Sequence, residues 1–98
     1  MYRHVSFDKA LAKELQKRDF AREFLLAQME GDEALPLVEA LRVTIRRMGV
    51  KEFAKKAHIR ANNVSRMLNG HVEPSIDTLD HFLGLFGLRT KLFVEKVA

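Results

Sequence analysis

The residues of this sequence best suited to contact a charged or hydrogen-bonding ligand lie in one short stretch, between positions 60 and 69. When the apolar residues Val64, Met67 and Leu68 are set aside, the remaining side chains are short, polar or basic: Arg60, Ala61, Asn62, Asn63, Ser65, Arg66 and Asn69. None of them is acidic. Asparagine pairs bidentately with adenine and arginine with guanine, whereas a carboxylate would repel phosphate. We therefore expect this face to bind the major groove of DNA, with Asn62, Ser65 and Arg66 choosing the base sequence.

Two short helices must position this face, because apolar residues recur at helical spacing on both sides of a brief interruption. We expect the first helix over residues 50–57 and the second over residues 61–69. Helices joined by so few residues cross steeply, and Ala54 is small enough for a close approach. Phe53 and Ala57 then form the inner face of the first helix, and Ile59 fills the turn.

The same periodicity predicts helices along most of the chain. Ser6 would cap a first helix that carries Phe7, Leu11 and Leu15, and Asp19 would cap a second. A third helix begins between residues 32 and 36 and ends at Gly49. Ser75 would cap a sixth, which ends at Gly87.

The pattern changes after residue 87. Thr90, Phe93 and Val94 favour a short strand, and a strand alone needs a partner, which a second copy of the chain could supply. We expect an all-α fold with two N-terminal helices and a short C-terminal β-strand. It would form a single domain over residues 1–98. Within it we expect an N-terminal helical extension (1–33), a core with the two crossing helices (34–87) and the strand (88–98).

Composition excludes several classes of protein. The chain has 98 residues and no cysteine, so disulfides, a thiolate nucleophile and cysteine zinc ligands are ruled out. Its four histidines are scattered without metal-ligand spacing, and no arrangement of a nucleophile with a base is visible. We expect no metal, no cofactor and no enzyme activity. The sequence also shows no apolar secretory segment and no stretch near the ~20 apolar residues of a membrane span, so we expect a cytoplasmic protein without membrane contact.

Positive charge is concentrated around the two crossing helices. The net charge of the chain is +4. Residues 42–72 have Glu52 as their one acidic residue against eight basic ones: Arg42, Arg46, Arg47, Lys51, Lys55, Lys56, Arg60 and Arg66. Such a field attracts a polyanion. We expect Lys51 and Lys55 to contact phosphate. Arg42, Arg46 and Arg47 either grip phosphate or form the solvent face of their helix.

These two helices resemble the helix-turn-helix of the lambda-repressor-like (XRE) family. The matching residues are Ala54, Ile59, Val64 and the sequence Leu68-Asn69-Gly70, followed by Pro74-Ser75-Ile76 before the next helix. The resemblance covers roughly residues 36–87. It implies a homodimer that binds a palindromic operator on double-stranded DNA.

Three positions depart from the family pattern. His58 stands where glycine is usual, because the turn needs a left-handed backbone. Arg60 replaces a capping serine or threonine, so Asn62 or Asn63 could instead cap a later start, which would change the residues that face the groove. Val50 replaces a phosphate-binding glutamine, whose contact Lys51 would take over.

The flanking segments are similar to a group of addiction-module antidotes, the HigA-type antitoxins. The similarity lies in residues 17–25, in the acidic turn Glu30-Gly31-Asp32-Glu33 and in residues 85–94. It implies an antitoxin that neutralises a small RelE/HigB-like toxin and represses its own promoter. Two alternatives stay open: an orphan regulator of the XRE type, and an interaction module that binds a toxin with weak or no DNA binding. RNA is a poorer ligand, because the basic stretch has no aromatic platform for stacking.

Overall fold

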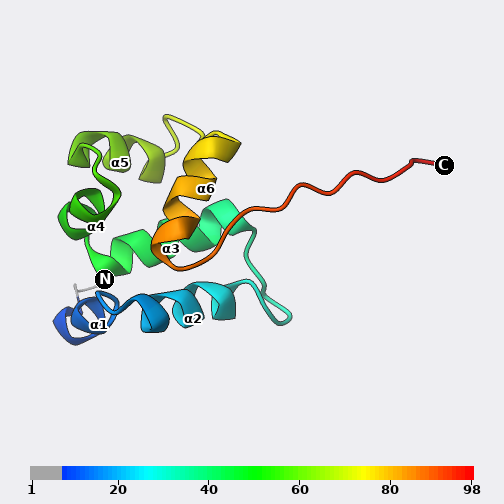
Figure 1. Ribbon diagram of the computed structural model, residues 1–98. Helices are drawn as coiled ribbons and strands as arrows, with labels where there is room; N and C mark the ends of the chain where they lie inside the picture. Colours follow the sequence, from blue (N-terminus) through cyan, green and yellow to red (C-terminus); the bar gives the residue numbers. More distant parts are fainter. Residues whose placement is uncertain (1–7) are drawn as a thin grey trace, which may run out of the picture.

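The computed structural model describes residues 8–98, over which six helices follow one another (Figure 1). They are α1 (Lys9–Glu14), α2 (Arg18–Gln28), α3 (Leu37–Met48), α4 (Val50–Ala57), α5 (Ala61–Leu68) and α6 (Ile76–Leu85). The all-helical prediction is confirmed for this part of the chain, and it contains no strand. The predicted cap Ser6 and the apolar Phe7 lie outside the described residues.

The two N-terminal helices begin at other residues than the sequence pattern predicted. Asp8 caps α1, since its carboxylate accepts from the N–H of Leu11 at 3.0 Å. Helix α2 begins at Arg18, with Lys17 in the cap position and no side-chain cap. Asp19, the predicted cap, instead lies in the first turn, where its charge suits the helix dipole.

Helix α3 is central to the packing. It follows Pro36, which cannot donate a backbone hydrogen bond. It ends at Gly49, because a φ of 111° is incompatible with a helix. In Figure 1, α1 and α2 lie on one side of α3, and α4, α5 and α6 lie on the other. Gln28 links α2 to α3 by donating to the Thr44 hydroxyl at 2.9 Å.

One hydrophobic core joins the helices. Its fully buried large side chains come from the turn after α1, from the four helices α2 to α5 and from the cap residue of α6: Leu15, Leu25, Leu41, Ile45, Phe53, Val64 and Phe86. Phe82 of α6 packs edge-on against Phe53 of α4, with ring centroids 5.1 Å apart. The crossing helices α4 and α5 are therefore fixed to the same core as α3 and α6.

The predicted strand over residues 88–98 is wrong. The N–H of Leu88 donates to the Leu83 carbonyl at 2.8 Å, and the N–H and hydroxyl of Thr90 both donate to Asp80 at 2.8 Å. These hydrogen bonds lower the pKa of Asp80, and the bond from the Thr90 backbone N–H has the largest effect. Beyond Thr90, residues 91–98 run away from the helices (Figure 1). A strand needs a neighbour to pair its backbone groups, and the described residues of one chain offer none.

Within residues 8–98, no helix has the length and apolar character needed to cross a bilayer.

Candidate nucleic-acid interface

A left-handed residue ends α4 and turns the chain. His58 has φ 58° and ψ 42°, and the N–H of Ile59 reaches back to the Ala54 carbonyl at 3.1 Å. This backbone pattern closes a helix and needs a residue that accepts positive φ. Histidine is among the few residues other than glycine that do so with some frequency. The sequence expectation for this turn and for the bounds of α4 is confirmed.

Helix α5 begins directly after the turn. Arg60 is extended, with φ −73° and ψ 138°, and its carbonyl accepts from the N–H groups of Asn63 at 3.0 Å and Val64 at 3.2 Å. The helix therefore starts at Ala61 without a side-chain cap. The alternative start, with a cap at Asn62 or Asn63, is wrong. The faces of α5 are thereby fixed.

The polar residues singled out in the sequence lie on the solvent side of α5. Arg60, Asn62, Asn63, Arg66 and Asn69 are exposed, whereas Ala61 and Ser65 are half-buried. Val64, Met67 and Leu68 on the opposite face are buried, as expected. Among the described residues, neither Arg60 nor Arg66 forms an ion pair. The outer face of α5 therefore offers amide, hydroxyl and guanidinium groups to a ligand.

Helix α4, which packs against α5, carries two exposed cations. Lys51 lies in its first turn and Lys55 in its last. The ammonium of Lys55 is 3.8 Å from the Glu52 carboxylate, and both side chains are more than half exposed. A surface ion pair of this kind is weak and leaves Lys55 able to meet a phosphate.

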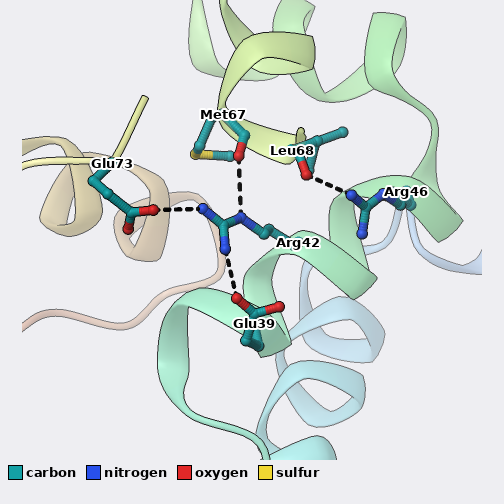
Figure 2. Close-up of polar contacts among 6 residues, drawn as sticks. All are labelled: Glu39, Arg42, Arg46, Met67, Leu68 and Glu73. Atoms are coloured by element: carbon teal, nitrogen blue, oxygen red, sulfur yellow. Dashed lines mark hydrogen bonds and ion pairs between the residues drawn. The ribbon is translucent and has the colours of Figure 1, made fainter. Parts of the chain in front are cut away.

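Arg42 of α3 has neither of the roles weighed from the sequence, since it does not face a phosphate site or the solvent. It is only 8% exposed, and Figure 2 shows its guanidinium between three acceptors. Its Nε donates to the carbonyl of Met67 at 3.0 Å, and its terminal nitrogens contact Glu73 at 3.0 Å and Glu39. The bond to Glu73, more than any other contact, raises the pKa of Arg42.

Arg46, one turn further along α3, makes a similar contact. Its side chain is exposed, but its guanidinium donates to the Leu68 carbonyl (Figure 2). Both arginines thus bind carbonyls in the last turn of α5, where cations are favoured by the helix dipole. They fix the end of the helix that carries the polar face. The spacing of Arg42 and Arg46 is visible in the sequence, but their acceptors follow only from the fold.

Helix α6 supports the C-terminal end of α4. His81 Nε2 lies 2.8 Å from the carbonyl of Ala57, the last residue of α4. No role was predicted for His81 from the sequence. Together with α3, α6 holds the α4–α5 unit from behind, so the polar face of α5 stays free. This arrangement is that of a helix-turn-helix.

Comparison with known protein families agrees with this class. Residues 43–90 match the family described as the Cro/C1-type HTH DNA-binding domain. No curated protein and no solved structure matched the chain. The match covers the C-terminal part of α3, the helices α4, α5 and α6, and the chain as far as Thr90. The DNA-binding, XRE-like nature of this segment is thus supported, whereas α1 and α2 lie outside it.

Proposed function

We propose that the protein is a sequence-specific transcriptional regulator that binds a palindromic operator as a homodimer, with α5 of each copy in a major groove. The observation that carries the proposal is the outer face of α5, which is polar, free of acidic residues and held from behind by α3 and α6. The Cro/C1-type match over residues 43–90 supports it independently. The two half-sites would then lie about 34 Å apart, one turn of DNA.

The residues divide into two roles. Asn62, Ser65 and Arg66 read base edges, because amide, hydroxyl and guanidinium groups match base donors and acceptors. Lys51, Lys55, Arg60, Asn63 and Asn69 contact the phosphate backbone, which supplies affinity without choosing sequence. Ala61, at the start of α5, is small enough to let the helix approach the bases.

Binding to DNA duplexes tests this division. The DNA upstream of the protein's own gene is mixed with random duplexes, and the sequences that the protein binds are selected. The affinity for each selected sequence is then measured by fluorescence anisotropy at two salt concentrations. Asn62→Ala and Arg66→Ala should each cost about 1–3 kcal/mol on the selected site and little on a scrambled duplex. Lys51→Ala is the matched control, and it should weaken binding to the selected site and to the scrambled duplex by the same amount. Failure to select any sequence, or base-reading variants that behave like Lys51→Ala, would refute the assignment.

A more specific proposal is that the regulator is the antitoxin of a toxin–antitoxin module. The observation that favours it is that α1, α2 and the turn after them lie outside the matched domain. Glu30, Asp32 and Glu33 in that turn are exposed, and they would suit a basic RelE/HigB-like toxin. Co-expression with the neighbouring gene product tests this: the antitoxin should co-purify with it and relieve its toxicity. An orphan regulator would bind the operator but not the neighbour.

A further inference from the structure

A cleft lies between α5, α6 and the loop that joins them. Its volume is about 410 Å³, and its floor is apolar, since Val64, Met67 and Phe82 are buried there. Val72, also apolar, lies at its edge and is 42% exposed. Small-molecule sites commonly have this size and this mixture of an apolar lining with a few polar groups. The cleft is therefore large enough to hold a small aromatic compound.

Contacts within the protein fix the walls of the cleft. The loop after α5 is folded back by a hydrogen bond from the His71 N–H to the Arg66 carbonyl, at 2.9 Å. Further along this loop, Glu73 accepts from the Arg42 guanidinium at 3.0 Å (Figure 2). The cleft is thus formed before any ligand binds, which lowers the conformational cost of binding.

The charge of the cleft favours an anion. Among the described residues that line it, two are charged, Arg66 and Glu73. The Glu73 carboxylate is paired with Arg42, whereas Arg66 is exposed and forms no ion pair within residues 8–98. A planar guanidinium binds a carboxylate with two parallel hydrogen bonds. Arg66 therefore offers the cleft a site for a carboxylate.

Thr78 of α6 adds a hydrogen-bond donor on the other wall of the cleft. The Ser75 hydroxyl accepts from the Thr78 N–H at 3.1 Å and donates to the Thr78 hydroxyl at 3.0 Å. The hydrogen of the Thr78 hydroxyl has no acceptor among the described residues. It is thus able to bind an oxygen atom of a ligand.

We propose that this cleft binds a small aromatic carboxylate, with its carboxylate on Arg66 and Thr78 and its ring against Met67 and Phe82. A thioether and a phenyl ring both make favourable contacts with an aromatic ring. Arg66 also belongs to the outer face of α5, so a bound carboxylate takes it away from the base edges of DNA. The ligand would therefore act as an inducer that releases the operator, a consequence that rests on the proposed function.

Cinnamate is the probe, and its neutral amide, cinnamamide, has the same shape without the charge. Cinnamate is titrated into the full chain without DNA and followed by NMR. It should bind saturably and shift the backbone amides of Val64, Met67 and Phe82. Cinnamamide should bind about tenfold more weakly, because it cannot form the charge-assisted bonds to Arg66.

Variants at the two polar walls test the contacts. Arg66→Gln should weaken the binding of cinnamate about tenfold and leave that of cinnamamide nearly unchanged. Thr78→Val, which removes the hydroxyl, should weaken the binding of cinnamate about threefold. Arg60→Gln is the matched control, since Arg60 is an exposed arginine beside α5 that does not line the cleft. It should change the affinity for cinnamate less than about twofold.

Release of the operator is measured separately, by fluorescence anisotropy with the selected duplex. Saturating cinnamate should weaken operator binding by the parent protein. It should not weaken operator binding by Val72→Trp, whose larger side chain fills the edge of the cleft. An operator affinity that cinnamate leaves unchanged in the parent protein would overturn the inducer role.

Three results, all obtained without DNA, would overturn the site itself. They are the absence of saturable cinnamate binding, equal affinities of the parent protein for cinnamate and cinnamamide, and an equal loss of affinity in Arg66→Gln and Arg60→Gln. Binding of cinnamate to a protein that selects no DNA sequence would instead refute the proposed function and leave the ligand site intact.

Discussion

The guanidinium group of Arg42 binds three acceptors that come from α3, from the end of α5 and from the loop before α6. Its Nε donates to the Met67 carbonyl at 3.0 Å, beside the N–H of Gly70, which donates to the same carbonyl at 3.1 Å. The two carboxylates are half or more exposed, so their ion pairs contribute little. The hydrogen bond to the Met67 carbonyl contributes more to stability than the ion pairs, because water cannot easily take its place.

Replacing Arg42 by leucine should therefore lower the free energy of unfolding by about 1–3 kcal/mol, because it removes a largely buried hydrogen bond made by a charged donor. Arg47→Leu is the control, because Arg47 lies on the same helix and forms no ion pair among the described residues. Urea unfolding followed by circular dichroism measures both variants. Equal stabilities of the two would show that Arg42 does not hold the end of α5.

Asp80 makes the start of the C-terminal segment sensitive to acid. Its pKa is lowered in the folded protein because the Thr90 backbone N–H, and then the hydroxyl, bind the ionised form. A lowered pKa means that this contribution to stability is present above the ordinary carboxyl pKa and is lost as pH falls through the lowered value. We expect the amide resonance of Thr90 to shift in that acidic range by NMR. In Asp80→Asn the shift should vanish; a Thr90 amide that does not titrate in the parent protein would contradict the contact.

At the scale of elements, the turn between α4 and α5 depends on one residue with positive φ. His58 pays a steric cost there that glycine would not. Replacement by glycine should raise the free energy of unfolding by up to about 1 kcal/mol, partly offset by the greater freedom of glycine in the unfolded chain. Replacement by valine, which is β-branched, should lower it by about 1 kcal/mol or more.

Thermal unfolding compares the two variants with the parent protein. Because His58 is exposed, neither change disturbs the core, so the difference reports on the backbone of the turn. Equal melting temperatures for glycine and valine would mean that the turn is not left-handed in solution.

At the scale of the whole molecule, binding to DNA should depend steeply on salt. Three of the eight basic residues between positions 42 and 72 donate to protein carbonyls: Arg42, Arg46 and Lys56. In the proposed complex Lys51, Lys55 and Arg60 contact phosphate, and each phosphate neutralised adds about −0.9 to the slope of log affinity against log salt. Lys51→Ala should reduce the slope by about 0.9 per copy of the chain.

Lys13→Ala is the control for this measurement. Lys13 is exposed on α1, outside the matched domain, and its removal changes the net charge of the chain equally. An unchanged slope is expected for it. If both variants reduce the slope alike, the protein attracts DNA by its overall charge and not through α4.

The sequence by itself determined the helices of the DNA-binding domain and their inner faces. Apolar spacing and turn residues are local signals, so α4 was predicted with its observed bounds and Val64, Met67 and Leu68 as buried. The outward face of α5 follows by subtraction. The starts of α1 and α2 were less well predicted, because several polar residues there can occupy a cap position.

Only the tertiary structure decided what depends on residues distant in the sequence. Arg42 and Arg46 carry the same local signal as a solvated basic face, and their acceptors lie 25 and 22 positions away. The start of α5 at residue 61 was predicted, but a later start capped by Asn62 or Asn63 stayed open until the structure showed the backbone of the turn. The strand over residues 88–98 failed for the same reason: its pattern is local, but strand formation needs a partner, and one copy of the chain supplies none.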